Sequence, residues 1–202
     1  MKAKDLLKYK KDLDAAITNS KTNLFFNDSI LHAMMITNAL FKKAALESQK
    51  NVYMYCGEFS LFRDKTKSKV LNEKMECSTD GLDTDELEMW GKISFFTDLQ
   101  ESLKKFLENG TLKVIIANNV KTIPEESVWS IIEPYINNKK VEIYELKSNV
   151  GLDHFATTND SYRIENSDKD KTAICCFRDK LNADVLQNNF KDLLKLSQLV
   201  EF

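Results

Sequence analysis

The chain contains two histidines, and His154 is the one whose neighbours could support chemistry. It stands in the segment DHFATTND, which we predict to be a β-strand. Glu58 follows an earlier predicted strand, and Arg163 and Glu165 lie on the next one. A histidine oriented by a carboxylate can act as a nucleophile or as a general acid and base. His154, Glu58, Arg163 and Glu165 are therefore the candidate site residues.

The same residues also permit a structural interpretation. His154 could hydrogen-bond to Glu58 or Glu165 at the start of a strand, and Arg163 could pair with either carboxylate. Buried ion clusters of this kind can help to specify a fold, but they are weak support for function or stability.

Other kinds of site find little support in the sequence. Neither glycine-rich phosphate-binding pattern, GxGxxG or GxxxxGK[ST], occurs, and the GxSxG pattern of serine hydrolases is absent. The four cysteines form no CxxC pair, so a zinc site is not expected. The acidic stretch STDGLDTDE lacks EF-hand spacing and is typical of a solvated surface. We expect no cofactor and no metal ion.

The overall charge argues against binding to nucleic acid by bulk electrostatics. The 202 residues include 29 Lys and Arg against 31 Asp and Glu, a formal net charge of −2. Such binding normally requires a basic excess, although a local basic groove would be compatible with this composition. No apolar run approaches the ~18 residues needed to span a membrane. The first residues lack the apolar centre of a signal peptide, so we expect a cytoplasmic protein with reduced thiols.

The hydrophobic pattern predicts an α/β fold with two parts. Residues 1–50 are predicted to be an N-terminal helical segment, with Asn27, Asp28 and Ser29 as caps before its second helix. Residues 51–202 are predicted to be one α/β domain. Its strands are expected near 52–56, 112–117, 141–146, 154–159, 161–165 and 172–177, and its last helix at 182–200.

The order of these elements predicts the topology of the domain. The strand–helix rhythm over 51–146 indicates parallel crossovers, and the three short strands that follow indicate antiparallel pairing. The fold class is therefore α/β, with a mixed sheet of about six or more strands flanked by helices and an N-terminal helical extension. The polar stretch 64–90 is expected to be mobile, with one short helix near 70–75.

Three segments of the C-terminal region carry a resemblance to a known family. They are Asp153 to Asp160 (DHFATTND), Tyr162 to Glu165 (YRIE) and Ala173 to Phe177 (AICCF), followed by a helix with Leu186, Phe190 and Leu194. This region resembles the second half of a phospholipase D-like (HKD) domain, and the upstream order of elements is similar over 51–202. The resemblance implies the mixed sheet of that family and a closing C-terminal helix.

The sequence departs from the family pattern at positions that matter for catalysis. His154 matches the family histidine, but Ala156 stands where the family has lysine. Ser161 stands where it has aspartate, and Asp160 lies one place short. Nothing in 166–177 reproduces the family's Gly-Ser-x-Asn stretch. The family's chemistry uses a histidine nucleophile on phosphorus, a second histidine as acid, and lysines that neutralise the phosphoryl oxygens.

Two interpretations from different classes follow from the resemblance. The favoured one is a non-catalytic phospholipase D-like interaction module, in a prokaryotic mobile-element or phage-defence system. The alternative is a divergent metal-independent nuclease or phosphodiesterase that uses His154 from two protomers. Ala156 favours the first. A plain α/β binding domain with an accidental resemblance comes third.

The apolar content predicts that the chain associates with a partner. The segment 24–41, together with Phe155, Ile164 and Phe177, carries more apolar surface than one small sheet needs. We expect a homodimer with twofold pairing or a complex with another protein. In the competing arrangement, the N-terminal helices fold back and cover this surface within one chain. Nucleic acid is a weaker candidate partner because of the net charge, and no membrane contact is expected.

Overall fold

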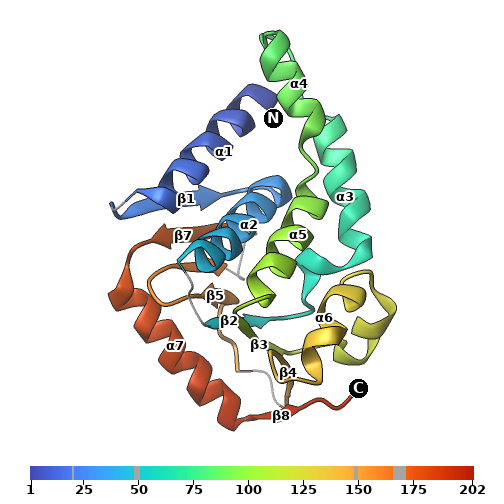
Figure 1. Cartoon of the computed structure of the whole chain (residues 1–202), viewed down its shortest axis with the longest axis vertical. Coiled ribbons are helices and arrows are strands. Elements are labelled where there is room, and N and C mark those ends of the chain that lie inside the picture. Colours follow the sequence, from blue (N-terminus) through green and yellow to red (C-terminus); the bar gives the residue numbers. More distant parts are fainter. Residues whose placement is uncertain (20, 48–50, 148–149, 166–171) are drawn as a thin grey trace.

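A mixed eight-stranded sheet organises the part of the chain that the computed structural model describes, residues 1–19, 21–47, 51–147, 150–165 and 172–202 (Figure 1). The strand order is β1-β7-β6-β5-β2-β3-β4-β8. The strands are β1 (Asn23–Asn27), β2 (Asn51–Cys56), β3 (Thr111–Ile116), β4 (Val141–Leu146), β5 (Phe155–Thr157), β6 (Tyr162–Glu165), β7 (Ala173–Phe177) and β8 (Ser197–Leu199).

The pairing confirms the predicted fold class. Strands β2, β3 and β4 are parallel, whereas β5, β6, β7 and β1 continue the sheet with antiparallel pairs on one side and β8 closes the other. The helices are α1 (Ala3–Thr18), α2 (Ile30–Leu46), α3 (Asp64–Met75), α4 (Thr84–Lys92), α5 (Phe95–Leu107), α6 (Trp129–Ile136) and α7 (Lys180–Lys195), with 3-10 turns at η1 (Ser60–Phe62) and η2 (Val120–Glu125).

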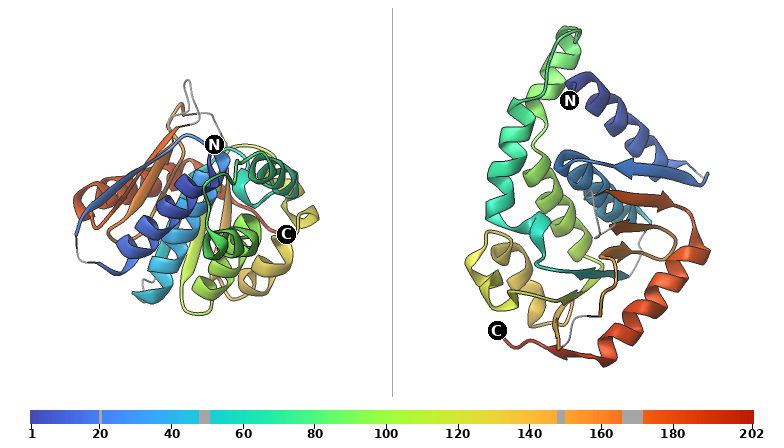
Figure 2. Two further views of the ribbon diagram at one scale, coloured as in Figure 1. Left: turned by 90° about the horizontal axis from the view of Figure 1, so that it is seen from above. Right: turned by 180° about the vertical axis from the view of Figure 1, so that it is seen from behind.

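Helices cover both faces of this sheet (Figure 2). Helices α1, α2 and α5 pack with Val114 and Ile116 in one hydrophobic cluster, and α7 packs with Ile115 in the other. Alternate residues of a strand face opposite sides, so the two clusters lie on opposite faces. Cys175 and Cys176 divide between them in the same way, as expected from their adjacency.

The expectation that the first 48 residues are helical is wrong at one segment. Residues 23–27 form β1, the edge strand that pairs with β7 and places Phe25 opposite Cys175. The side chain of Phe25 packs against Tyr9, while Leu24 and Phe26 are exposed. This alternation has the period of a strand, and the sheet supplies the backbone partners that a five-residue segment cannot provide for itself.

The expected mobile stretch 64–90 is instead mostly helical. Helix α3 occupies 64–75, and α4 follows because Asp83 and Glu86 form a reciprocal capping box. In that motif each side chain accepts a hydrogen bond from the other residue's backbone N–H, which satisfies donors that a helix start leaves unpaired. One further boundary differs: the last helix ends at Lys195, before β8.

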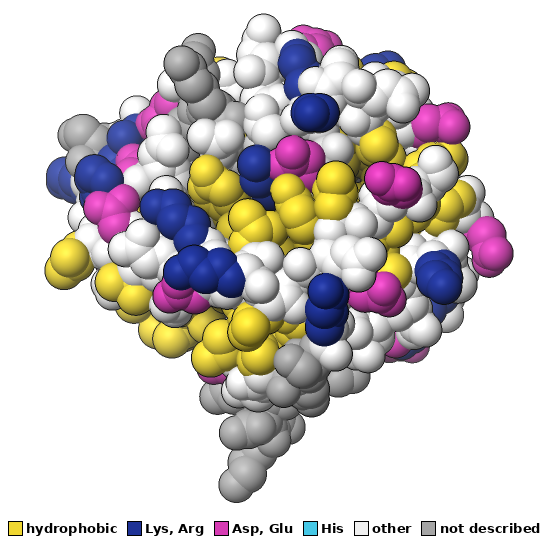
Figure 3. Space-filling model, turned by 90° about the horizontal axis from the view of Figure 1, so that it is seen from below, with side chains coloured by type: hydrophobic (Ala, Val, Ile, Leu, Met, Phe, Trp, Pro, Cys, Tyr) yellow, Lys and Arg dark blue, Asp and Glu magenta, His cyan; other side chains and the backbone are white. Residues whose placement is uncertain are grey.

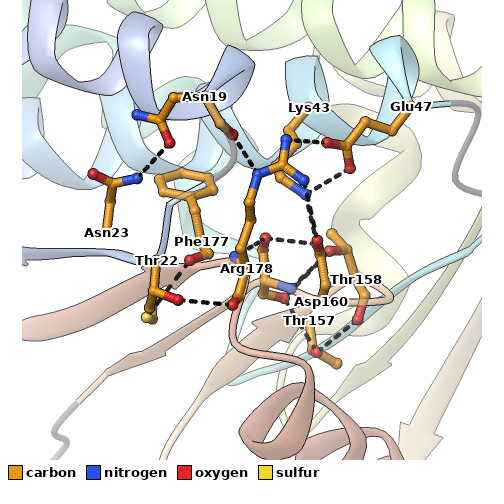
Figure 4. Close-up of polar contacts among 12 residues, drawn as sticks. Asn19, Thr22, Asn23, Lys43, Glu47, Thr157, Thr158, Asp160, Phe177 and Arg178 are labelled. Carbon is orange, nitrogen blue, oxygen red and sulfur yellow. Dashed lines mark hydrogen bonds and ion pairs between the residues drawn. The ribbon is translucent and has the colours of Figure 1, made fainter.

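A network of four charged side chains, of which Lys43 is fully buried, ties distant segments together (Figure 4). The fully buried Lys43 ammonium of α2 donates to Glu47 Oε2 at 2.6 Å and to Asp160 Oδ1 at 2.5 Å. Arg178, after β7, donates to Glu47 Oε1 at 2.6 Å and to the Asn19 carbonyl. Two cations thus face two carboxylates. The network joins the end of α1, α2, the β5–β6 turn and the β7–α7 loop.

We predict that replacing Lys43 destabilises the fold strongly. Lys43→Met leaves the carboxylates of Glu47 and Asp160 without their buried cation, and breaking a buried pair in this way costs about 3 kcal/mol of unfolding free energy. Urea denaturation measures the effect. The matched control is Lys42→Met, because Lys42 is half-exposed and lies 3.8 Å from Asp14; its effect should stay within about 0.5 kcal/mol. Equal stability of the two variants would contradict this account.

Candidate functional site

The antiparallel register of β5 and β6 brings three of the four predicted site residues together. Ala156 pairs with Arg163, and the Glu165 N–H donates to the His154 carbonyl at 2.8 Å. Directly paired residues in a sheet face the same side, and so do alternate residues along one strand. His154, Ala156, Arg163 and Glu165 therefore share the face that is covered by α2.

Glu165 lies at the centre of the polar contacts on this face. Its Oε2 is 3.4 Å from His154 Nδ1, and its Oε1 accepts a hydrogen bond from Arg163 Nη2 at 3.1 Å. The imidazole also packs edge-on against the Tyr55 ring, with the centroids 5.6 Å apart. The carboxylate thus holds the histidine on one side and neutralises the arginine on the other.

These contacts account for the electrostatics of the cluster. The hydrogen bond with His154, opposed by partial burial and aided by the Arg163 charge, lowers the pKa of Glu165 to about 2. Glu165 is therefore ionised at neutral pH. In contrast, burial raises the pKa of the nearby Cys56 thiol to about 12. The Cys56 thiol is therefore protonated at neutral pH, unlike the Glu165 carboxylate.

The structure places the fourth predicted residue, Glu58, in a different cluster. Its Oε2 accepts from Lys65 Nζ at 2.6 Å and its Oε1 accepts from Asn119 Nδ2 at 3.0 Å. The Lys65 hydrogen bond, more than any other contact, lowers the pKa of Glu58. Phe59 adopts a left-handed conformation with φ of 57°, so the chain turns sharply just after Glu58. Among the described contacts, the partner of His154 is Glu165 and not Glu58.

The space beside the histidine is small. A cavity of about 30 Å³ lies between β5, β6 and α2, and its lining includes Thr37, Phe59, His154 and Arg163. That volume accommodates about one water molecule. Thr37 Oγ1 and Arg163 Nε are buried without a hydrogen-bond partner among the described residues. A water molecule between α2 and β6 would satisfy such groups.

Sequence reasoning missed two residues that shape this site. Thr37 comes from α2, and nothing in its local sequence connects it with His154. Gly57 directly follows β2, and a Cβ atom there would lie 3.1 Å from His154 Cε1, which is tighter than most real contacts. A glycine directly after a buried strand was the available signal for a close approach.

Arg163 brings a positive charge close to the position where the family has lysine. It stands opposite Ala156 on the neighbouring strand, so a cation does reach this part of the sheet. However, only 6% of the residue is exposed and its guanidinium is paired with Glu165. The described part of the Gly-Ser-x-Asn region, 172–177, contains β7, and residues 166–171 lie outside the described residues.

The described residues contain neither a cluster suited to a metal ion nor a helix suited to cross a membrane. Within them, no group of three or more His, Cys, Asp or Glu side chains is arranged to hold a metal ion. None of the helices in the described ranges has the length and apolar character required to cross a membrane.

Comparison with known proteins identifies the fold through structure alone. No protein-family model and no curated protein matches the sequence. The chain is similar in structure to TrmBL2, an archaeal chromatin protein described as showing a novel mode of DNA binding. The TM-score is 0.54 at 11% identity, and the match covers 98% of this chain but only 62% of TrmBL2.

A second similar structure belongs to the family indicated by the sequence. It is Nuc from Salmonella typhimurium, a phospholipase D family member, with a TM-score of 0.51 at 8% identity. The match covers 90% of this chain and 99% of Nuc. At these identities the similarity shows the fold alone. The chain therefore has a phospholipase D-like fold, and the resemblance predicted from 153–177 is confirmed at that level.

We predict that Glu165→Gln lowers stability at pH 7 but not at low pH. The pKa of Glu165 is about 2 in the folded chain against an ordinary value of 4.5, so the ionised carboxylate stabilises the fold above about pH 4.5. This contribution is lost as the pH falls toward 2, where the neutral acid resembles glutamine. Urea unfolding at pH 7 should show a loss on the order of 2 kcal/mol, which shrinks below pH 4.

The control for this comparison is Glu145→Gln, which removes an exposed glutamate from β4. It reports the general effect of losing one negative charge. A Glu165→Gln effect that is the same at pH 7 and pH 3, or that matches the control, would contradict the assigned role of Glu165.

Proposed function

We propose that this chain is a non-catalytic interaction module built on a phospholipase D-like fold. The observation that carries the proposal is that the space beside the histidine is small and the charges around it neutralise one another. The cavity beside His154 holds about one water molecule, and the cation nearest to the missing lysine position is paired with Glu165.

Phosphodiester hydrolysis would require more than this arrangement supplies. The attacking histidine needs an open path to phosphorus, and positive charge must be available for the phosphoryl oxygens as they gain charge. Ala156 provides no charge, and Glu165 already occupies the Arg163 guanidinium. A phosphate that bound Arg163 here would have to displace the Glu165 carboxylate from the guanidinium. The displaced carboxylate would then lie beside the phosphate oxygens and repel them.

A second candidate function is a divergent metal-independent nuclease or phosphodiesterase that uses His154 from two protomers. One observation favours it: a third of the His154 side chain is exposed, and Arg163 lies opposite the position of the missing lysine. Twofold pairing would then have to bring two such sites together and release Arg163 from Glu165. The DNA binding described for TrmBL2 makes DNA a suitable test substrate.

The proposal includes association with another copy or another protein, in the cytoplasm and in a prokaryotic mobile-element or phage-defence system. Much of the apolar surface expected to drive association is buried within the chain, because Phe177 packs in the cluster that contains α2 and Phe155 packs in the cluster that contains α7. Exposed apolar side chains remain on β1, β7 and α7: Leu24, Phe26, Ile174, Leu181 and Val185. Figure 3 shows the side where α7 and β8 lie, with hydrophobic side chains gathered in bands between charged ones.

We predict that the purified chain does not hydrolyse phosphodiesters without metal. With bis-(p-nitrophenyl) phosphate, single-stranded DNA and double-stranded DNA in the presence of EDTA, product formation should stay at the uncatalysed rate. The physical reason is that, among the residues the structure describes, the cation opposite Ala156 is already paired with Glu165 and is not available to the phosphoryl oxygens. His154→Ala should give the same rates, with its folding checked by thermal unfolding. Cleavage that is robust in the wild type and disappears in His154→Ala would establish the second candidate instead.

A further inference from the structure

An open pocket lies at the β1 edge of the sheet, on the face that α7 covers elsewhere. Its volume is about 600 Å³, which is within the usual range for sites that bind small molecules. Phe26 of β1 lies opposite Ile174 of β7, which lies opposite Ile164 of β6, so the three side chains form one apolar floor. Helix α7 packs on β2, β4, β5 and β6 and runs toward β8, away from β1 (Figure 1). Phe26 therefore remains 62% exposed and Ile174 43% exposed.

One side of this pocket contains His32, the second histidine of the chain, in a fixed orientation. Asp28 Oδ1 lies 2.9 Å from His32 Nδ1, and the imidazole packs on the Tyr9 ring with the centroids 4.3 Å apart. In the neutral imidazole, a carboxylate at Nδ1 selects the tautomer that keeps the lone pair on Nε2. His32 Nε2 has no hydrogen-bond partner among the described residues and is not buried. It therefore offers a hydrogen-bond acceptor to a molecule in the pocket.

The wall of the pocket also contains an amide group without a partner. Asn27, the last residue of β1, lines the pocket and is 2% exposed. Neither its Oδ1 nor its Nδ2 has a hydrogen-bond partner among the described residues. A buried polar group in this state is costly, and most such groups in folded proteins are paired. An amide presents a donor beside an acceptor, which matches the edge of a heterocyclic base in the way that asparagine pairs with adenine.

The charged side chains of the pocket disfavour a phosphorylated ligand. Among the described residues, its lining contains Asp28 and Asp153 and neither Lys nor Arg. Residues 166–171 lie outside the described residues and contain two Asp and two Lys, so they add no net charge. A phosphate group placed here would face carboxylates and be repelled, whereas sugar hydroxyl groups can donate hydrogen bonds to the same oxygens.

We propose that this pocket binds a nucleoside, an uncharged planar heterocycle that carries sugar hydroxyl groups. The base lies on the apolar floor, where the exposed Phe26 ring provides a stacking surface. The Asn27 amide turns from the wall to pair with the edge of the base, and His32 Nε2 accepts from an N–H or hydroxyl group. The pocket shares no lining residue with the cavity beside His154, so this inference does not depend on whether that site is catalytic.

Isothermal titration calorimetry of the full chain tests the proposal. The probes are adenosine, guanosine, cytidine and uridine, each with its 5′-monophosphate, and free ribose. We expect saturable binding of at least one nucleoside with a Kd below about 1 mM. Its monophosphate should bind at least about tenfold more weakly because of the carboxylates, and ribose should give no signal because it lacks the ring.

Substitutions in the floor and at the histidine locate the binding site. Ile174→Arg lays a long charged side chain across the floor and should weaken nucleoside binding about tenfold or more. The matched control is Leu181→Arg on α7, an exposed leucine outside the pocket, which should leave Kd unchanged. His32→Phe keeps a ring against Tyr9 but removes both nitrogens, and it should also weaken binding about tenfold. His154→Ala should have no effect.

Asn27→Leu distinguishes a role in binding from a role in the fold. The leucine side chain has a similar size and leaves no polar group unpaired, so the thermal unfolding midpoint of the free chain should not fall. Nucleoside binding should nevertheless weaken about tenfold or more.

Several outcomes would overturn the nucleoside proposal. They are the absence of saturable binding up to about 10 mM nucleoside, tighter binding of the monophosphate, and equal affinity for Ile174→Arg and Leu181→Arg. A lower unfolding midpoint of Asn27→Leu together with an unchanged Kd would assign Asn27 to the fold and would equally reject the proposed site.

Discussion

The ammonium group of Lys43 is fully buried, and the carboxylates of Glu47 and Asp160 balance its charge. A buried cation without such partners is too costly for a folded chain, so these contacts must form whenever the chain folds. Asp160 lies in the turn between β5 and β6, where the Thr158 N–H donates to the Ser161 carbonyl. The ion pair therefore holds in place the turn that sets the register of the two strands.

That register determines the chemistry of the histidine site. With the turn closed by Thr158 and Ser161, Ala156 must pair with Arg163. A slip by one residue would turn Arg163 toward the opposite face, where α7 packs its apolar side chains. Helix α2 contributes twice to this arrangement, because it supplies Lys43 to the turn and Thr37 to the cavity near His154. A substitution in α2 can therefore alter the structure at both ends of β5.

Local pattern in the sequence was sufficient to predict most strands but not the contacts between distant segments. Strands β2, β3 and β4 are rich in β-branched and other apolar residues, and their prediction is confirmed. Strand β1 was missed because five residues between two helices show little periodicity by themselves. Helix α4 was missed because its stability comes from a capping box rather than from an apolar face. The Lys43–Asp160 pair spans 117 residues, and no local pattern reports it.

The site residues illustrate the same limit. Arg163 and Glu165 alternate on one strand, so their shared face followed from the sequence once β6 was assigned. The direction of Glu58 did not, because its partners Lys65 and Asn119 come from other segments of the chain. The direction of a side chain in a loop is set by backbone angles that residue type alone rarely specifies.

The arginine opposite Ala156 is not equivalent to a lysine at that position. A lysine on a strand beside a histidine presents a compact charge on a flexible stem, free to meet a phosphoryl oxygen. Arg163 presents a planar guanidinium, which matches a carboxylate well, and Glu165 stands two residues away on the same face. The two charges satisfy each other inside the sheet, and the histidine is bound to the same carboxylate. The arrangement therefore directs its charges toward one another, so that Glu165 balances the positive charge that Arg163 brings to the histidine.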